Sequence, residues 1–579
     1  MYRCWFLIFW LILVSSSFVQ GQNVQKKLVI NCVEKERQLL KKYRFNHSPS
    51  DVEEARNEIS RLIATLQKDG YFTAQAGDLS TQVNQFITTL RIGKQYNWAK
   101  LLAGNLSPLL QDKTGFREKF FLHKPFHYQE VAQLMENVLQ YAENTGYPFA
   151  SVRLTNVSIS DEEVTGSLDY QPGPFITFGH LHLKDSSIVK PAFLAAYLGI
   201  KSGTPYQQRK INHIESMISE LSYLSIETPV RISFQNESAD VYLEILGRRS
   251  NQVDGVISFL PSEGKEGKLL LTGEVNLLLN NLFHTGKTLA LQWQRLQVLS
   301  QQLMVHYDHT NLLKSPIDVT LNFDFLKEDT LFINRDFRTE ISFRKDAYTK
   351  VGIFANLRSS RLLGVQGAPS SPDLALDYAD YNLTNYGIKY TWKKLNHHLF
   401  PKRGVAVAWE VSAGNKKLRN KQLPDNHNVS DNSWQYTFLG AFSHYHTMGK
   451  NLVLYNRLQG GTIQNEQLFL NDLWRIGGLH SLRGFNEKLF FAASYALSNL
   501  ELRLLFDEQQ EEYSYLFLFY DQAYMVRESY SDYPSGIGAG ISLVTKSGIF
   551  NLAYALGNAK RQSMNLSVSK IHFGYIGRF

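Results

Sequence analysis

In Val319-Thr320-Leu321-Asn322-Phe323-Asp324-Phe325, an apolar residue alternates with a polar one at every step. Because successive side chains of a β-strand point to opposite faces, this period of two predicts a strand with one apolar and one polar face. The same pattern recurs at Val405–Val411 and at Leu500–Leu504. Such a strand can present one face to lipid and the other to a polar lumen.

Segments with this alternation follow one another through the second half of the chain, separated by polar turns. The sixteen segments begin near Val253, Leu270, Thr288, Gln302, Ile317, Arg338, Lys350, Tyr386, Gly404, Gln435, Leu452, Ala496, Ser514, Gly536, Gly548 and Lys570. An even number, with about 20 residues per strand and turn, predicts a closed transmembrane β-barrel over residues 251–579. A large soluble β-sandwich is the alternative, but its packing does not call for so many aromatic segments. We expect the polar insertions Ser359–Asp380 and Ala413–Ser433 to be external loops, with the short turns facing the periplasm.

The N-terminus carries Arg3, an apolar run from Cys4 to Val14 and small residues up to Gly21, an order typical of a secretory signal peptide. We expect residues 1–21 to be removed; a membrane anchor is the alternative, but a span needs roughly 20 apolar residues. The mature chain then keeps one cysteine, Cys32, and cannot form an internal disulfide. The basic residues behind the formal charge of +8 are scattered without a long run, which argues against nucleic acid binding.

Three repeats precede the barrel region, marked by tyrosines at intervals of 76 residues: Tyr71, Tyr147 and Tyr223. Each tyrosine follows a segment whose apolar residues recur every three or four positions, which predicts an amphipathic helix. These residues are Val52, Ala55, Ile59, Leu62, Ile63 and Leu66 in the first repeat, Val131, Leu134, Met135, Val138, Leu139 and Ala142 in the second, and Ile211, Ile214, Met217, Ile218 and Leu221 in the third. Two strand-like runs come next, at Val230–Phe234 and Val241–Ile245 in the third repeat.

Two of these helices end at glycine, in Gly70-Tyr71-Phe72 and Gly146-Tyr147-Pro148-Phe149. Glycine permits a left-handed helix stop, after which the aromatic residue can pack back onto the helix. The third repeat lacks this glycine, so its helix must end differently. The order of strand, helices, Gly-Tyr-Phe and two strands resembles the POTRA domain over about residues 25–247; three unrelated α+β modules are the alternative. We expect POTRA-like domains at 22–97, 98–175 and 176–250, and the resemblance implies that they bind extended client segments at a sheet edge.

A glycine-rich motif lies between the eleventh and twelfth predicted strands: Gly477-Gly478-Leu479-His480-Ser481-Leu482-Arg483-Gly484-Phe485. It resembles the Gly-Gly…Arg-Gly-Phe loop of the BamA and TamA group of outer-membrane assembly barrels. The resemblance implies that the loop folds into the lumen and that its arginine pairs with an aspartate on strand thirteen, which here is Asp521. A buried arginine needs a carboxylate partner, and Glu501 is the second candidate. The alternative is that Arg483 is an ordinary solvated loop residue.

The last residues, His572-Phe573-Gly574-Tyr575-Ile576-Gly577-Arg578-Phe579, resemble the terminal β-signal of outer-membrane barrels, with Gly574 and Phe579 in its pattern. Gly577 departs from that pattern, since an aromatic residue is usual there. In the BamA and TamA group, the first and last strands form a weakly paired seam that opens sideways. The resemblance implies a seam between Val253–Phe259 and Lys570–Phe579, where few ladder bonds and a strand glycine ease opening.

The candidate motifs for catalysis or cofactor binding in this sequence are incomplete. Gly286-Lys287-Thr288 looks like the end of a phosphate loop, but Asn281 stands where the first glycine is required. His444 and His446 can share one strand face, yet zinc sites usually need three or four protein ligands. We therefore expect neither an enzyme nor a bound metal or cofactor.

The pattern taken together predicts a fold of α+β periplasmic repeats followed by a 16-stranded antiparallel outer-membrane barrel. By resemblance, and closest to TamA, its function is to insert unfolded client proteins into the outer membrane or move them across it. A TamB-like periplasmic partner and outer-membrane lipid are the implied partners. The alternative is a two-partner secretion transporter, although those usually carry two repeats and a plug helix. A passive porin would leave the repeats and the Arg483 loop without a role.

Overall fold

The computed structural model describes residues 26–261, 269–295, 300–329, 331–363, 378–397, 400–419, 430–509, 512–528, 530–545, 548–560 and 562–578. The expected signal segment, residues 1–21, and the terminal Phe579 lie outside these residues. Contacts divide the chain into two compact units, Met1–Ile176 with Pro205–Gln208 and Thr177–Thr204 with Arg209–Phe579. Among the described residues, no helix has both the length and the apolar character required to cross a membrane.

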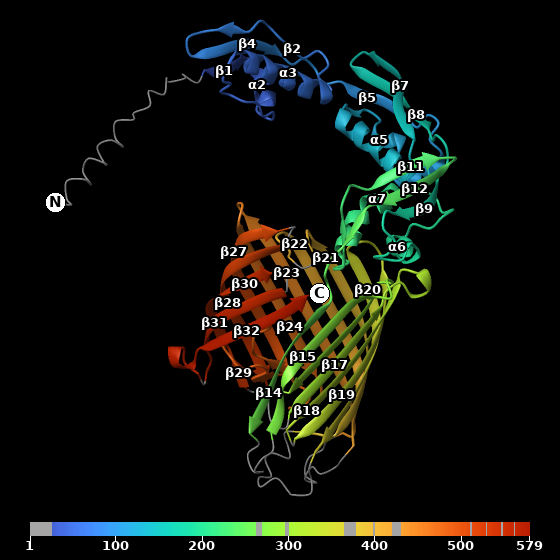
Figure 1. The fold of residues 1–579 in the computed structure, drawn as a ribbon. Helices are drawn as coiled ribbons and strands as arrows, with labels where there is room; N and C mark the ends of the chain where they lie inside the picture. The colour runs from blue at the N-terminus through green and yellow to red at the C-terminus, as the bar shows by residue number, and fades with distance from the viewer. Residues whose placement is uncertain are drawn as a thin grey trace, which may run out of the picture. The chain divides into compact units, whose positions relative to one another are not determined.

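The first module packs two helices against a small sheet (Figure 1). Its elements are β1 Lys27–Asn31, α2 Glu34–Leu40, α3 Val52–Lys68, β2 Gln75–Ala76, β3 Ser80–Thr81 and β4 Gln85–Arg91. The sheet order is β1-β4-β2, with β1 parallel to β4 and β3 also paired to β4. Four residues of the predicted apolar stripe of α3 are buried, Ala55, Ile59, Leu62 and Leu66, whereas Val52 at its start is exposed. Asp51 caps the start of α3 by accepting the backbone N–H of Glu54 at 2.7 Å.

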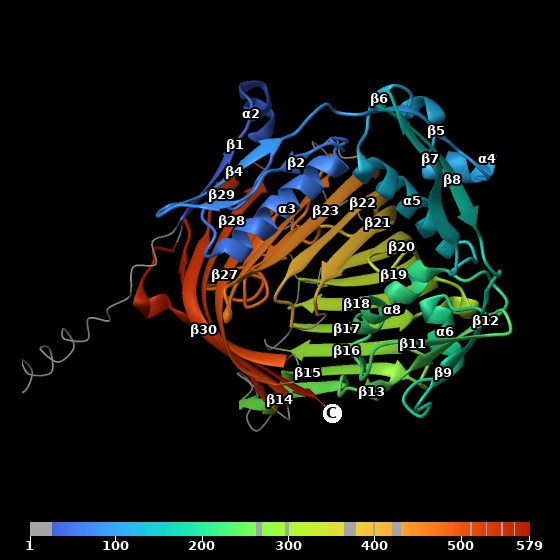
Figure 2. The same cartoon turned by 90° about the horizontal axis from the view of Figure 1, so that it is seen from above.

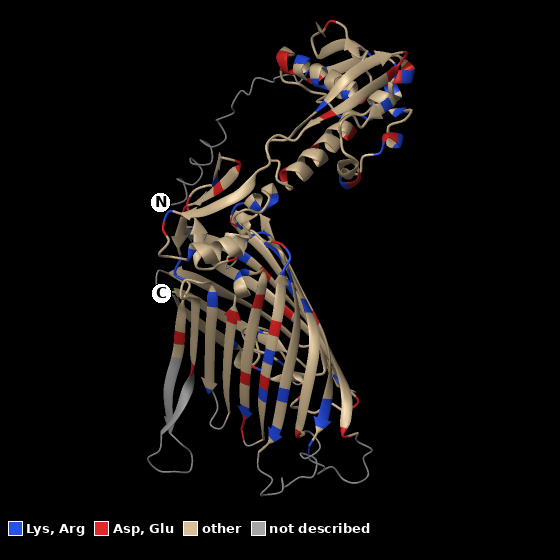
Figure 3. Ribbon diagram, turned by 90° about the vertical axis from the view of Figure 1, so that its right-hand side faces the viewer, with Lys and Arg blue, Asp and Glu red and all other residues tan. Residues whose placement is uncertain are grey.

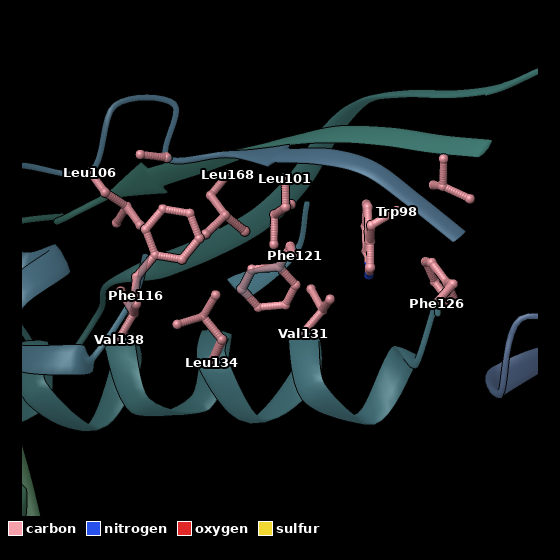
Figure 4. Packing of buried hydrophobic residues seen from close by; sticks show 12 residues of the cluster. Trp98, Leu101, Leu106, Phe116, Phe121, Phe126, Val131, Leu134, Val138 and Leu168 are labelled. Atoms are coloured by element: carbon pink, nitrogen blue, oxygen red, sulfur yellow. The ribbon is translucent and has the colours of Figure 1, made fainter. Parts of the chain in front are cut away.

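The second module has the same plan with a longer sheet. Its elements are β5 Asn97–Leu102, α4 Pro108–Thr114, η1 Glu118–Phe120, β6 Lys124–Pro125, α5 Tyr128–Glu143, β7 Ser151–Ser160 and β8 Glu163–Gln171, in the sheet order β6-β5-β8-β7. Figure 4 shows the apolar face of α5, with Val131, Leu134 and Val138, beneath Trp98 and its neighbours on the sheet. The expected domain boundary after residue 97 falls inside β5, because Asn97 already donates its N–H to Glu162 O at 3.0 Å.

The two glycine helix stops form as predicted. Gly70 and Gly146 have φ values of +88° and +100°. The next residue in each case, Tyr71 or Tyr147, returns its N–H to a carbonyl five residues earlier at 3.0 Å, which closes the helix end. Tyr71 is then buried against α3.

The third module has two short helices, α7 and α8, where the sequence predicted a single helix. The elements are β9 Thr177–Leu183, α6 Pro191–Leu198, α7 Gln208–Asn212, α8 Ile214–Ser219, β10 Leu224–Ile226, β11 Arg231–Gln235, β12 Ser238–Leu243 and β13 Ile245–Gly247. The helix is interrupted at His213, whose N–H is shared between the carbonyls of Arg209 and Lys210 at 3.2 Å each. The second predicted strand was also too long, since Ile245 belongs to β13, which pairs with β10.

The sixteen-stranded antiparallel barrel is confirmed, and Figure 2 shows its strands curving around the lumen. The strands are β14 Gln252–Pro261, β15 Leu269–Leu282, β16 Lys287–Arg295, β17 Gln301–His309, β18 Ile317–Glu328, β19 Phe332–Arg344, β20 Thr349–Leu362, β21 Tyr381–Leu395, β22 Gly404–Leu418, β23 Asn432–Met448, β24 Leu452–Gln464, β27 Ser494–Gln509, β28 Glu512–Arg527, β30 Ser535–Thr545, β31 Gly548–Asn558 and β32 Lys570–Arg578. The short β29, Tyr530–Asp532, extends the pairing at the end of β28. Single turns of 3-10 helix occur at Leu312–Lys314 and Leu566–Val568.

Several strands extend further than predicted. The strand expected near Arg338 begins at Phe332, and the insertions expected at Ser359–Asp380 and Ala413–Ser433 lose residues to β20, β22 and β23. The prediction left Arg335-Asp336 and Lys416-Lys417 outside the strands because they are charged, but in the structure each pair alternates between the two faces of a strand.

The seam between the first and last strands has far fewer pairs than its neighbours. β14 meets β32 only through Gln252 opposite Arg578 and Val253 opposite Gly577, among the residues described. In contrast, β14 pairs with β15 along its whole length from Gln252 to Pro261. A Cβ at Gly577 would lie 2.6 Å from Val253 O, so glycine permits this close approach.

The third module is attached to the turns at one end of the barrel. Asn281, next to the β15–β16 turn, donates to Ile188 O at 2.8 Å. Arg344, at the end of β19, donates to Tyr197 O at 3.3 Å, and its guanidinium lies 4.2 Å from the Tyr197 ring. The short-turn end of the barrel is therefore the end that carries the module.

The left-handed stop at Gly70 provides a test of the first module. Gly70→Ala forces a side chain into a φ of +88° and brings Cβ to 2.8 Å from Phe126 O. Gly115→Ala is the matched control, because Gly115 has a φ of +76° but no neighbour within 4 Å of the new Cβ. We expect both variants to lose about 1 kcal/mol from backbone strain, and Gly70→Ala to lose distinctly more. Limited proteolysis of the full-length protein in a urea series measures this, and equal losses would contradict the close packing at Gly70.

Candidate functional site

The long connection between β24 and β27 folds into the barrel and carries the Gly477–Phe485 motif. Its two short strands, β25 Trp474–Ile476 and β26 Phe490–Ala492, pair with each other. Gly477 and Gly478 between them have φ values of +127° and +103°. A Cβ at Gly478 would lie 2.0 Å from the Glu487 carboxylate, which itself accepts the N–H of Leu479 at 2.8 Å. These two glycines therefore allow the tight turn that directs the motif toward the wall.

Arg483 is held by both of the carboxylates that the sequence suggested. Its Nε and Nη2 donate to the two oxygens of Asp521 at 2.7 and 2.6 Å, and its backbone N–H donates to Asp521 Oδ2 at 3.1 Å. Its Nη1 donates to Glu501 Oε1 at 2.6 Å. Asp521, on β28, is completely buried, and Arg483 is only 5% exposed. This is a bidentate, charge-assisted geometry that needs both the planar guanidinium and a fixed carboxylate.

The charges around Arg483 balance. Glu501 Oε2 accepts a second guanidinium, from Arg503 Nε at 2.8 Å, and Asn499 donates to Asp521 Oδ1 at 2.8 Å. Two cations thus face two carboxylates, so the cluster leaves no net charge in the lumen wall. The guanidinium of Arg483 also lies 3.7 Å from the centre of the Phe519 ring, two residues before Asp521 on the same face of β28.

Glycines of the facing strands make room for the motif. A Cβ at Gly536 would lie 2.0 Å from Arg483 O, and one at Gly557 would lie 2.8 Å from the Phe485 ring. Phe485 is 1% exposed and packs with Leu482 into an apolar cluster that includes Ala523 of β28. No sequence signal links Gly536 or Gly557 to the loop, since a strand glycine can equally mark a bulge or a bend.

The motif also touches the last strand. Gly484, with a φ of +93°, places its N–H 3.3 Å from His572 Nε2. A Cβ at Gly574 would lie 3.6 Å from a Leu479 methyl group, so this residue of the expected β-signal faces the loop. The inserted loop therefore contacts β32, one of the two strands of the seam.

A second anchor, which no sequence motif indicated, holds the start of the same loop to another part of the wall. Lys416 of β22 forms an ion pair with Asp472, and the exposed fractions of the two side chains are 1% and 0%. The Lys416 ammonium lies 4.7 Å from the rings of both Tyr381 and Phe469. Asp472 also accepts the N–H of Phe469 at 2.9 Å.

Neighbouring contacts strengthen this second anchor. Asn471 donates to Ser360 Oγ of β20 at 2.7 Å, and its carbonyl accepts from Asn334 of β19 and from the Tyr381 hydroxyl at 3.2 Å each. Further along the loop, Arg475 pairs with Glu328 of β18 at 3.0 Å. The loop is thus fixed to β18–β22 near its start and to β27 and β28 at Arg483. No group of three metal-ligating side chains occurs within the described ranges, and the contacts seen at the site are charge pairing and packing.

The comparisons with known proteins identify the family. The Omp85 superfamily domain matches residues 281–579, which is more than half of the chain. The chain belongs to the Omp85 superfamily. A closed sixteen-stranded barrel in this superfamily makes the chain an outer-membrane protein. Among curated proteins, a search finds no match.

Solved structures similar to this Omp85 protein include two of CdiB. CdiB from Escherichia coli is 12% identical with a TM-score of 0.54, and the alignment covers 91% of this chain and 97% of that one. CdiB from Acinetobacter baumannii is 11% identical with a TM-score of 0.52, covering 84% and 90%. BamA from Haemophilus ducreyi lacking POTRA domains 1–3 is 15% identical with a TM-score of 0.43, covering 84% and 100%. At such identities the likeness concerns the fold alone.

Replacing Arg483 tests the first anchor of this Omp85 barrel. Arg483→Ala leaves the buried carboxylate of Asp521 without its main partner, and we expect a loss of about 3–5 kcal/mol in the free energy of unfolding. Arg483→Lys keeps the charge but not the bidentate geometry, so its loss should be intermediate. Urea unfolding followed by the gel shift between folded and heated barrel gives both values. A barrel as stable with alanine as with arginine would show that Arg483 is not an anchor.

The neighbouring lysines of β22 form a matched pair for the second anchor. Lys416→Met leaves the buried Asp472 carboxylate without its ion pair, and we expect a loss of about 3–5 kcal/mol by the same measurement. Lys417→Met removes an equal charge from the exposed face and should change stability by less than about 0.5 kcal/mol. Similar values for the two variants would contradict the second anchor.

Proposed function

We propose that this protein inserts client polypeptides into the outer membrane, or moves them across it, by opening the seam between β14 and β32. The observation that carries this proposal is the two-pair seam next to a loop that contacts β32 through His572. Every other junction of the barrel wall has at least seven paired residues among those described. Because each ladder pair contributes hydrogen bonds, the seam is the junction that costs least to separate.

The N-terminal modules are proposed to lie in the periplasm and to receive the clients. They precede the first strand, and the third one is joined to the short-turn end of the barrel, which is the periplasmic end in bacterial barrels. The edge strand β7, Ser151–Ser160, is the longest strand in the three modules as described, and its second half is exposed. An extended client segment can pair with such an edge by strand addition.

The inserted loop has a mechanical role in this proposal. The loop is anchored at Asp472 and at Arg483. It thereby keeps β18–β22 and β27–β28 in place while the strands of the seam separate. No catalytic step is part of the proposed function, and unfolded outer-membrane or secreted polypeptides are the proposed clients. A TamB-like periplasmic protein, which would deliver clients to a TamA-like barrel, is the proposed partner.

Dedicated two-partner secretion is the second candidate. The alignment with CdiB from Escherichia coli covers nearly all of both chains, so that fold also accommodates this sequence. The three successive α/β modules favour the first candidate, because two-partner secretion transporters usually carry only two such modules before the barrel. The two functions differ in their products, since one yields several folded barrels and the other a single secreted protein.

Closing the seam with a disulfide tests the proposed route. In a Cys32→Ser background, Gln252→Cys with Arg578→Cys places cysteines on directly opposed residues of β14 and β32. We expect the oxidised protein, in liposomes, to insert an unfolded client barrel no faster than liposomes without protein, and the reduced protein to regain the wild-type rate. His444→Cys with Asn456→Cys joins β23 to β24 and is the control that should keep activity when oxidised. Unchanged insertion through the sealed seam would overturn the route.

A further inference from the structure

Five cations gather on the outer surface of the barrel, on one group of adjacent strands. They are Lys327 of β18, Arg335 of β19, Arg361 of β20, Lys417 of β22 and Arg419 just after β22, and we call them the outer cationic belt. Figure 3 shows Lys and Arg at the lower ends of several barrel strands, away from the turns that carry the third module.

The strand alternation shows that the belt faces outward. On β19, Arg335 shares its face with Phe337 and Ile341, which are 45% and 47% exposed. On β20, Arg361 shares its face with Ile353 and Leu357, whereas the intervening Ser360 is fully buried. Residues on one face of a barrel strand all lie on the same side of the wall, so these cations lie on the outside of the barrel and not in the lumen.

The strand register places the belt at one level. Ile333, two residues before Arg335, lies opposite Arg361, and Lys417 lies opposite Asn382, whose side chain accepts from Arg361 at 3.2 Å. From Val351, near the other end of β20, to Arg361 is a rise of roughly 25 Å for a strand tilted by about 40°. That matches the height of the apolar band of an outer-membrane barrel, so the belt lies at its far edge.

Aromatic residues mark the same edge. Trp434 and Tyr436, on the outward face of β23, are 59% and 54% exposed. Trp434 lies opposite Asn415 of β22. Asn415 is the outward-facing residue that precedes Lys417 on that strand. Aromatic girdles sit at the boundary between acyl chains and headgroups, so the belt lies at the headgroup level.

The belt lacks internal counter-charges. None of the five cations forms an ion pair with any other residue that the structure describes. Asp380 is the acidic group that acts on Arg361, and its carboxylate accepts the N–H of Leu362. Several other strands end their outward face in uncharged residues, such as Ser494 of β27, Val526 of β28 and Asn558 of β31, whereas β16 ends in Arg295. The outward cations at this level are thus concentrated on β18–β22.

We propose that the outer cationic belt binds the phosphate groups of anionic lipids in the outer leaflet of the membrane. Guanidinium groups take phosphate oxygens in pairs, and lysines add point charges. Phosphate at the headgroup level supplies the counter-charge that the described residues do not. β18 to β22 are the fifth to ninth strands, so bound lipid would hold the wall opposite the seam of β14 and β32. This proposal does not rest on the proposed function.

Native mass spectrometry of lipids retained by the purified full-length protein tests the belt. The probes are a bisphosphorylated, acylated glucosamine disaccharide and its dephosphorylated form, offered in equal amounts. We expect the wild type to retain the phosphorylated lipid at least about fivefold better, since each cation at a membrane surface contributes about 1 kcal/mol toward an anionic headgroup. Equal retention of the two lipids by the wild type would overturn the proposal without any variant.

Variants locate the binding. Arg335→Gln/Arg361→Gln/Arg419→Gln should lose the preference, and Arg361→Gln/Arg419→Gln should lose part of it. The control Lys314→Gln/Lys345→Gln/Lys450→Gln removes three exposed cations from turns at the other end and should keep the preference. The gel shift on heating verifies that each barrel is folded. A preference that survives in the folded triple variant, or that millimolar inorganic phosphate abolishes, would contradict a lipid site here.

Discussion

The ion cluster of Arg483, Asp521 and Glu501 is the constraint on which the barrel interior depends. A guanidinium that enters the lumen wall is stable only where carboxylates receive it, and a carboxylate as buried as Asp521 is stable only with a cation. Each partner therefore requires the other. This mutual need fixes the inserted loop, and with it the glycines Gly536 and Gly557 that give the loop its space.

The same physical rule operates at the other end of the loop. Lys416 and Asp472 are more deeply buried than Arg483, and two aromatic rings cover the ammonium group. With both ends held, the loop links β20–β22 to β27–β28 through the lumen. The seam at β14 and β32 has no comparable link, because its two paired residues and the contact at His572 are its main described connections. A barrel with a braced interior and one weak junction is suited to opening at that junction.

The strands could be predicted well from the sequence because period-two alternation reports directly on the two environments of a barrel wall. The pairing of Arg483 with Asp521 and Glu501 could also be predicted. The loop motif that carries Arg483 resembles one whose arginine pairs with a particular strand, and this limited the choice of partner. The Lys416–Asp472 pair could not be predicted, because alternation tells which face Lys416 occupies but not which residue of a long loop will meet it. Lys416 and Lys417 were even assigned to an external loop, although one lysine faces the lumen and its neighbour the outer surface. The broken helix at His213 likewise left no periodic signal.

A general assembly role centred on the inserted loop is tested most sharply by depleting this protein and quantifying the proteins of the outer-membrane and medium fractions. Cells rescued with wild type are compared with cells rescued with Arg483→Ala at equal barrel abundance. We expect several outer-membrane barrel proteins to be lost on depletion, and the wild type to restore them while the Arg483→Ala protein does not. Loss of one secreted protein alone, or full rescue by the variant, would refute that role.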